Sequence, residues 1–180
     1  MRGHQPTVLI LASGRGARFG ASGGHGSKLQ ALLQGKAVLQ HTLDAVRASG
    51  LPYHLETVAH PGMGDSIAAA VSATQDATGW LVLPGDLPLI QSNTLLAVAD
   101  ALNQHTVVVP VFEGQRGHPV GFGRVCRDAL LALSGDPGAA AIVRAHPAFE
   151  CSTNDRGVVT DVDTVQDLEQ VAMLLSARKR

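Results

Sequence analysis

Short apolar runs recur along this chain and alternate with longer segments of helical periodicity. The runs that predict strands are residues 8–11, 53–60, 80–83, 106–112, 120–122, 149–153 and 158–162. The helical pattern follows the turn at Gly35 as far as Gly50 and recurs over residues 67–77, 92–102, 125–133, 137–145 and 165–175. Alternating strands and helices predict a mostly parallel sheet that is covered by helices on both faces.

Composition restricts the classes of protein that need to be considered. The 180 residues are 45% hydrophobic and 16% charged, which suits one folded domain with a sizeable core. A net charge of −1 and 3% aromatic residues offer little to nucleic acid or to an anionic membrane. No apolar stretch is long enough to span a membrane, and no signal peptide is evident. We therefore expect a single cytoplasmic domain over residues 1–180, without nucleic-acid or membrane partners.

A glycine-rich loop with basic side chains directly follows the first predicted strand. It contains Gly14, Arg15, Gly16, Arg18 and Gly20, and Lys28 comes shortly after it. Glycines let backbone N–H groups approach a ligand closely, and N–H groups beside cations bind phosphate oxygens. The loop therefore predicts a phosphate site, with a tight turn as the alternative.

The spacing of this loop excludes two widespread nucleotide-binding motifs. A Walker A loop is absent, because the only Gly-Lys pair, at Gly35, is followed by Ala37. The dinucleotide motif G-x-G-x-x-G is also absent, because Phe19 stands at its third glycine position. A phosphate site here would consequently be of another type.

Two further features lie where open α/β sheets bind ligands. Asp86 follows the buried run 80–83, so it is expected at the carboxyl end of a strand. A carboxylate there suits Mg²⁺, which takes one or two carboxylates together with phosphate oxygens and water. Residues 61–66 open a helix with Asp65 or Ser66 as the expected cap, and such a helix start can hold an anion or a base edge. An ordinary turn and an ordinary capped helix are the alternatives.

Five segments, in this order, resemble the MobA-like nucleotidyltransferase family: LASGRGARFG with the following Lys28-Leu29, GMGDS, LPGDLP, GQRGHPV and DVDT with a later DL. The resemblance implies a three-layer α/β/α, Rossmann-like nucleotidyltransferase fold with a mostly parallel mixed sheet. It is closest to the molybdenum cofactor cytidylyltransferases, which implies Mg²⁺-dependent transfer of CMP from CTP to the phosphate of molybdopterin with release of pyrophosphate. A molybdoenzyme or its chaperone is the protein partner that this reaction implies.

The same resemblance assigns roles to individual residues. It implies catalytic roles for Arg18, Lys28 and Asp86, and nucleotide binding by Leu11, Ala12, Ser13, Gly14, Arg15, Gly16, Asp65 and Ser66. It places Arg116, Gly117, His118 and Pro119 at the acceptor, and Asp161 or Asp163 beside Asp86 near the metal. A phosphate acceptor is largely ionised, so this chemistry requires no general base.

Three departures from the family pattern leave alternatives open. Residues 51–60 have room for one strand, where family members usually place a strand, a helix and a further strand. Ser13 stands where cytidylyl members tend to have alanine and guanylyl members glycine. Residues 21–27 lengthen the loop before Lys28, so a flexible segment is expected to deliver this lysine. The alternatives are a GTP-using or sugar-phosphate nucleotidyltransferase of the same fold, and a non-catalytic nucleotide-binding protein.

Overall fold

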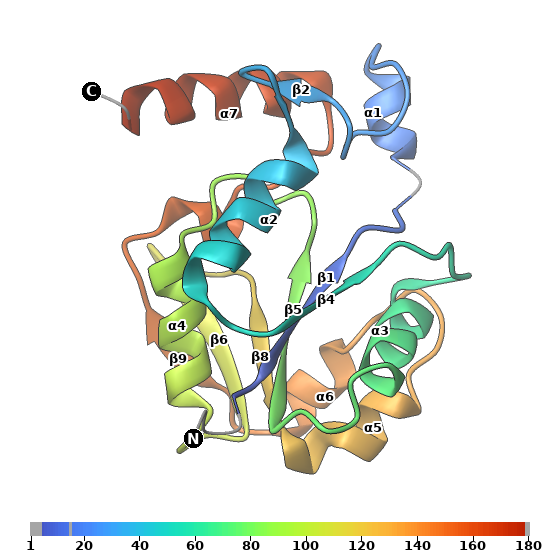
Figure 1. Cartoon of the computed structure of the whole chain (residues 1–180), viewed down its shortest axis with the longest axis vertical. Coiled ribbons are helices and arrows are strands. Elements are labelled where there is room, and N and C mark those ends of the chain that lie inside the picture. Colours follow the sequence, from blue (N-terminus) through green and yellow to red (C-terminus); the bar gives the residue numbers. More distant parts are fainter. Residues whose placement is uncertain (1–4, 15, 179–180) are drawn as a thin grey trace.

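The computed structural model describes residues 5–14 and 16–178, which form a central sheet flanked by helices (Figure 1). The seven strands of the sheet are β1 (Thr7–Leu11), β4 (Tyr53–Glu56), β5 (Gly79–Pro84), β6 (Val107–Phe112), β7 (Gln115–Arg116), β8 (Val120–Gly123) and β9 (Phe149–Ser152). A separate small hairpin joins β2 (Leu32–Leu33) to β3 (Lys36–Ala37).

The sheet is mixed and mostly parallel, as predicted. Its strand order is β4-β1-β5-β8-β6-β7, and β9 pairs with β6. The strands β4, β1 and β5 are parallel neighbours, and β9 is parallel to β6. Strand β8 is antiparallel to both β5 and β6, so these two strands point the same way. Leu11 is in register with Glu56 and Pro84, which brings the carboxyl ends of three strands to one edge.

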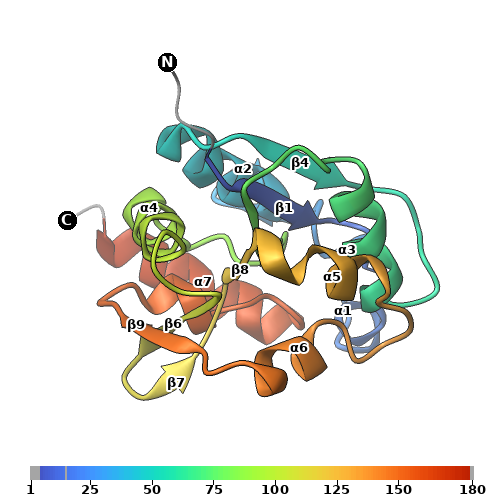
Figure 2. The same ribbon diagram turned by 90° about the horizontal axis from the view of Figure 1, so that it is seen from below.

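Helices cover both faces of the sheet (Figure 2). They are α1 (Ala17–Ala21), α2 (Val38–Ser49), α3 (Met63–Ser72), α4 (Ser92–Ala101), α5 (Arg127–Leu131), α6 (Ala140–Ala145) and α7 (Val165–Arg178), with 3₁₀ helices η1 (Arg124–Cys126) and η2 (Arg156–Val159). Among residues 5–14 and 16–178, no helix is both long enough and apolar enough to cross a membrane.

The period of two along the strands divides the core between the two faces. Val8 and Ile10 of β1 pack with side chains of α2 and α4, whereas Leu9 packs with side chains of α3, α5 and α6. A third cluster joins Leu33 and Val38 to Val171 of α7. The predicted start of α7 is confirmed, because Thr164 and Asp167 exchange hydrogen bonds as a capping pair.

The predicted strand over residues 158–162 is wrong, because residues 156–159 form the 3₁₀ helix η2. Asp155 is buried, and its carboxylate accepts hydrogen bonds from the backbone N–H of Gly157 and from Thr94 of α4. A Cβ atom at Gly157 would lie 2.3 Å from the carbonyl carbon of Leu89, so backbone packs directly against backbone here. These long-range contacts override the local strand pattern.

Several helix starts also differ from their predictions. Helix α3 begins at Met63 with Gly62 as its N-cap, so neither Asp65 nor Ser66 caps it. Helix α4 has Gln91 rather than Ser92 at its N-cap, and α6 begins after Ala139, beyond the predicted start at residue 137. The run 125–133 divides into η1 and α5, strand β4 ends at Glu56, and the glycine-rich loop contains the short helix α1.

Candidate active site

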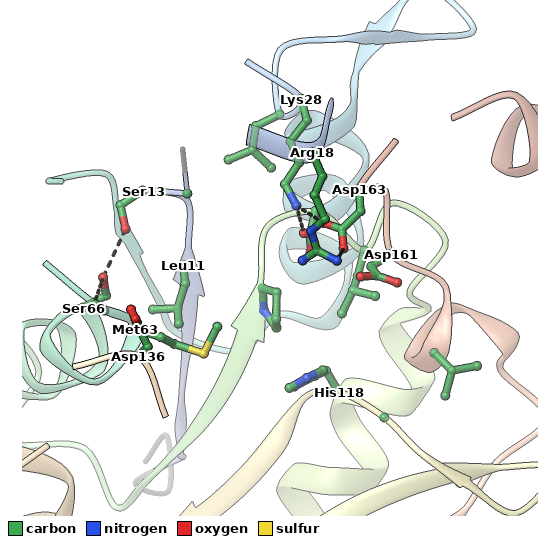
Figure 3. A pocket seen from close by; sticks show the side chains of 18 of the residues that line it. Leu11, Ser13, Arg18, Lys28, Met63, Ser66, His118, Asp136, Asp161 and Asp163 are labelled. Atoms are coloured by element: carbon green, nitrogen blue, oxygen red, sulfur yellow. Dashed lines mark hydrogen bonds and ion pairs between the residues drawn. The ribbon is translucent and has the colours of Figure 1, made fainter. Parts of the chain in front are cut away.

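A cavity of about 710 Å³ opens at the edge where β1 and β5 end (Figure 3). One end is rich in charged side chains, and the opposite end, called the neutral end below, carries mostly hydroxyl groups and glycines, with Asp136 as its one carboxylate labelled in Figure 3. The charged end is lined by Arg18, Lys28, Asp86, Asp161 and Asp163, the neutral end by Ser13, Gly14, Gly62 and Ser66, and the remaining wall includes Gln115, Arg116, Gly117 and His118. This volume is in the range of small-molecule sites.

Lys28 is the centre of the charged end. Its Nζ lies 2.5 Å from Oδ2 of Asp86 and 2.6 Å from Oδ1 of Asp163. Burial alone would lower the pKa of Lys28, but attraction to Asp86 and hydrogen bonds with both carboxylates raise that pKa above its ordinary value. The Lys28 side chain is only 12% exposed, whereas Arg18, which pairs with Asp163 at 2.8 Å, is 78% exposed. Two cations therefore approach Asp163, Lys28 from the interior and Arg18 from the surface.

The loop that carries Lys28 is attached to the rest of the fold at both ends, and the expectation that this loop is flexible stays a prediction. Leu29 beside it is 5% exposed, and its carbonyl accepts a hydrogen bond from the backbone N–H of Leu39. On the other side of the loop, Ser22 accepts a hydrogen bond from the backbone N–H of Val165 at the start of α7. The buried neighbour and these bonds position the lysine.

Backbone hydrogen bonds bring the aspartates together. The N–H of Val162 donates to the carbonyl of Asp86 at 3.0 Å, and Val162 itself is fully buried. Asp161 and Asp163 flank this valine and are thereby held beside Asp86. No local pattern in the sequence indicates this bond, because it joins segments that are far apart in the chain.

The turn that carries Asp86 is held from two sides. The N–H of Gly85 donates to the carbonyl of Leu11, and the hydroxyl of Thr42 in α2 donates to the carbonyl of Gly85, both at 2.9 Å. A Cβ atom at Gly85 would lie 2.9 Å from Cδ1 of Leu39, so a larger residue requires Leu39 to move. The glycine thus permits close packing of the turn against β1 and α2.

The three aspartates have the chemistry of a divalent-metal site. Asp86, Asp161 and Asp163 each offer one oxygen, and these oxygens lie within 4.8 Å of one another. Oδ1 of Asp86 is buried and has no hydrogen-bond partner among the described residues. Burial raises the pKa of Asp161, and the neighbouring carboxylates of Asp163 and Asp86 add to the increase. Such an all-carboxylate set fits Mg²⁺ or Mn²⁺, which prefer oxygen ligands.

The neutral end joins the first loop to the start of α3. Oγ of Ser13 lies 3.1 Å from Oγ of Ser66, and Ser66 also donates to the carbonyl of Gly62 (Figure 3). Among the residues predicted to bind nucleotide, Leu11, Ser13, Gly14 and Ser66 line the cavity, while Ala12, Gly16 and Asp65 do not. Asp65 instead accepts a hydrogen bond from the N–H of Gly135, and Arg15 lies outside the described residues.

The predicted acceptor residues are divided in a similar way. The cavity is lined by Arg116, Gly117 and His118 but not by Pro119. The guanidinium of Arg116 pairs with the carboxylate of Glu150 at 2.8 Å. His118 has a buried Nδ1 without a hydrogen-bond partner among the described residues. Burial lowers the pKa of His118, although Asp86 and the backbone of Val82 act in the opposite direction. His118 therefore presents a neutral ring to this wall of the cavity.

Sequence reasoning missed other residues that line the cavity. His60 and Asp136 line it and lie outside the five segments that carry the family resemblance. Met63 and Gln115 also line it and lie within GMGDS and GQRGHPV, but no role was expected for them. The Asp136 loop is brought to the site by α3, because the N–H of Gly64 donates to the carbonyl of Gly135 at 2.8 Å.

Residues 44–150 match the family model of the MobA-like NTP transferase domain. The chain belongs to this family. Proteins of this nucleotidyltransferase family bind an NTP and an acceptor, which agrees with a cavity that has distinct charged and neutral ends. The family resemblance found in the sequence is thereby confirmed, whereas the closer likeness to the cytidylyltransferases stays a prediction.

Solved structures share this fold over nearly its whole length. Rv0371c from Mycobacterium tuberculosis H37Rv is 26% identical, with a TM-score of 0.81 over 94% of this chain and 98% of that chain. Rv0371c has also been solved in complex with manganese, at 25% identity, a TM-score of 0.75 and the same coverages. Molybdopterin-guanine dinucleotide biosynthesis protein A from Archaeoglobus fulgidus has the same fold, with 15% identity, a TM-score of 0.65 and coverages of 95% and 99%.

Curated relatives include larger proteins. The bifunctional protein GlmU of Xanthomonas axonopodis pv. citri is 32% identical over 145 residues, which is 68% of this chain and 30% of GlmU. The chain therefore spans about 30% of the length of this relative.

Proposed function

We propose that this protein transfers a nucleoside monophosphate from an NTP to the phosphate of a small acceptor and releases pyrophosphate, with a divalent metal as cofactor. CTP and molybdopterin are the leading substrates. The single observation that carries the proposal is the position of Lys28 Nζ between Asp86 and Asp163, next to Asp161 and the guanidinium of Arg18. This arrangement combines cations for a triphosphate with carboxylates for a metal.

The reaction needs neutralisation of charge more than acid–base chemistry. An oxygen of the acceptor phosphate attacks the α-phosphorus, and the bond from that phosphorus to pyrophosphate breaks. A divalent ion on the aspartates, when bound, would offset the charge of the triphosphate. An ammonium group has three donors, and two on Lys28 are engaged by Asp86 and Asp163. The third can reach a phosphate oxygen, and Arg18 can supply further donors from the surface.

The nucleoside is proposed to occupy the neutral end of the cavity. Ser13 and Ser66 offer hydroxyl groups there, and a Cβ atom at Gly14 would have nothing within 4 Å, which leaves room for a base or ribose. This assignment places the triphosphate toward Lys28 and the acceptor along the wall of Gln115, Gly117 and His118. This assignment suits CTP as the nucleotide, and it suits GTP equally well.

A second hollow favours a sugar phosphate as the alternative acceptor. It measures about 310 Å³ and shares Gln115, Val159 and Asp161 with the main cavity. Arg156, Thr160 and Gln170 also line it and offer hydrogen bonds to hydroxyl groups. A substrate of this class is therefore worth testing beside molybdopterin.

The experiment is a pyrophosphate-release assay with each of the four NTPs, in Mg²⁺ or Mn²⁺, with molybdopterin and separately with sugar 1-phosphates. We expect release that requires metal, an acceptor and one preferred nucleotide. Nucleotide binding without release in any combination would favour the third reading, a non-catalytic nucleotide-binding protein. The metal carboxylates argue against that reading, because simple nucleotide binding does not require them.

A further inference from the structure

Lys28 bridges two carboxylates that are also candidate metal ligands. Its Nζ lies 2.5 Å from Oδ2 of Asp86 and 2.6 Å from Oδ1 of Asp163. The other oxygen of Asp163 pairs with the guanidinium of Arg18 at 2.8 Å. Cations therefore engage both oxygens of Asp163 and one oxygen of Asp86 (Figure 3).

A divalent ion at this site uses the same carboxylates. The candidate ligands are Asp86, Asp161 and Asp163, and neither oxygen of Asp163 is free of a cation. An ammonium group and a divalent ion on one carboxylate repel each other at close range, and little water is present in a partly buried site to screen that repulsion. The Lys28 contacts and tight metal binding consequently oppose each other.

Of the two cations at Asp163, Lys28 is the stronger competitor. Its side chain is 12% exposed and contacts two of the candidate ligands, Asp86 and Asp163. The side chain of Arg18 is 78% exposed and contacts Asp163 alone among these ligands. Ion pairs that are open to solvent are weak, so the Arg18 pair gives way to a metal at low cost.

The stem of Lys28 passes beside the loop that is predicted to bind nucleotide. A Cβ atom at Gly16 would lie 3.6 Å from Cγ of Lys28. The backbone of Lys28 is held in place, because its carbonyl accepts a hydrogen bond from the N–H of Ala31 at 3.3 Å. A lysine stem is flexible, so the ammonium can turn toward a new anion while the backbone stays where it is.

We infer that Lys28 controls access to the metal site: its ammonium competes with the divalent ion for Asp86 and Asp163 until a triphosphate draws it away. The third donor of the ammonium makes the first contact with a phosphate oxygen, and further phosphate contacts then replace those to the carboxylates. The inference rests on the proposed function and adds that the NTP and the metal bind cooperatively.

The test is a titration with Mn²⁺, followed by electron paramagnetic resonance, without nucleotide or acceptor, so that metal binding is measured apart from turnover. Lys28→Gln removes the charge and keeps a group that can donate a hydrogen bond. This variant should bind Mn²⁺ about tenfold more tightly than the wild type, as expected when a charged competitor for the ligands is removed. CTP should then increase the Mn²⁺ affinity of the variant by a smaller factor than that of the wild type.

Two further variants separate competition at the ligands from a general effect of charge. Arg18→Gln removes a charge from the same cavity at an exposed position, and it should change the Mn²⁺ affinity by less than about twofold. Lys36→Gln removes an exposed lysine that pairs with Asp44 and does not line the cavity, so the affinity should not change.

Thermal unfolding shows whether each variant is folded before titration, and Lys28→Met serves as the second variant at the central position. Equal Mn²⁺ affinity of the wild type and the folded Lys28 variant without nucleotide would overturn the inference. An equal gain in Arg18→Gln would also overturn it, because charge alone would then be the cause. Failure of the wild type to bind Mn²⁺ even with CTP present would instead overturn the proposed function.

Discussion

Nζ of Lys28 lies 2.5 Å from Oδ2 of Asp86, although the two residues are 58 positions apart in the chain. Both side chains are largely buried, at 12% and 14% exposed. A mostly buried charge is tolerated when a partner compensates it. The pair therefore leaves neither charge uncompensated at this edge of the sheet. In the proposed function it holds a cation and a carboxylate next to a phosphate and a metal.

Lys28→Ala should impair both stability and nucleotide use. The carboxylates of Asp86 and Asp163 lose their shared cation, which should cost about 1–3 kcal/mol of unfolding free energy. The apparent KM for NTP should rise and kcat should fall together, because phosphate contacts act in both the ground state and the transition state. Chemical denaturation and steady-state pyrophosphate release measure the two effects. Lys36→Ala, which removes an exposed lysine paired with Asp44, is the control and should change neither by much.

Asp86→Asn should abolish pyrophosphate release and leave NTP binding measurable. The amide keeps the shape of the side chain but removes the charge that the metal and Lys28 require. Asp76, which is exposed and does not line the cavity, provides the matched change Asp76→Asn. Turnover at the wild-type rate in Asp86→Asn would remove this residue from the metal site.

Gly117→Ala should disrupt the acceptor wall. Its Cβ atom would lie 2.2 Å from the carbonyl oxygen of Val158, so η2 or the Gln115–His118 segment must move. We expect the free energy of unfolding to fall by about 1–3 kcal/mol. The KM for the acceptor should rise by a larger factor than the KM for the NTP. Gly20→Ala is the control, because a Cβ atom there has nothing within 4 Å. Equal changes in the two KM values would contradict a role confined to the acceptor wall.

The lowered pKa of Glu56 predicts that the free energy of unfolding depends on pH. Its pKa is lowered on folding, so the stabilisation is present above the unfolded pKa of about 4.3 and is lost as pH falls through the lower folded value. Glu56→Gln should therefore be less stable than the wild type by about 1 kcal/mol near pH 6. That difference should shrink as the pH is lowered toward 3. Denaturant unfolding of both proteins across this range measures it, and a constant difference would show that charge is not the cause.

Much of the fold follows from the sequence, because local patterns and core packing agree. The run 80–83 forms a buried strand as predicted, so Asp86 falls at a carboxyl strand end, and Gly50 adopts a positive φ of 71° where the C-cap of α2 was expected. The convergence of Lys28 with Asp86 follows from the same topology. The strand and the helix end follow from local patterns, and the convergence follows from the parallel pairing of β1 with β5.

The remainder depends on contacts between distant segments. The carboxylate of Asp155 caps η2 by accepting a hydrogen bond from the N–H of Gly157. The hydrogen bond from the N–H of Val162 to the carbonyl of Asp86 holds Asp161 and Asp163 beside Asp86. Neither interaction leaves a periodic signal. His60 was missed because no ligand spacing in the sequence marks it, although it follows β4 directly and lies 3.4 Å from Glu56, four residues before it.

The central claim is that Asp86, Asp161 and Asp163 hold a divalent metal next to a triphosphate bound by Lys28 and Arg18. The most direct measurement is Mn²⁺ binding by electron paramagnetic resonance, for the wild type and Asp86→Ala, with and without CTP. The account predicts that the wild type binds Mn²⁺ more tightly when CTP is present and that Asp86→Ala loses at least about tenfold of this affinity, as expected for a removed ligand. Identical Mn²⁺ binding by the two proteins, or binding in the wild type that ignores CTP, would contradict it.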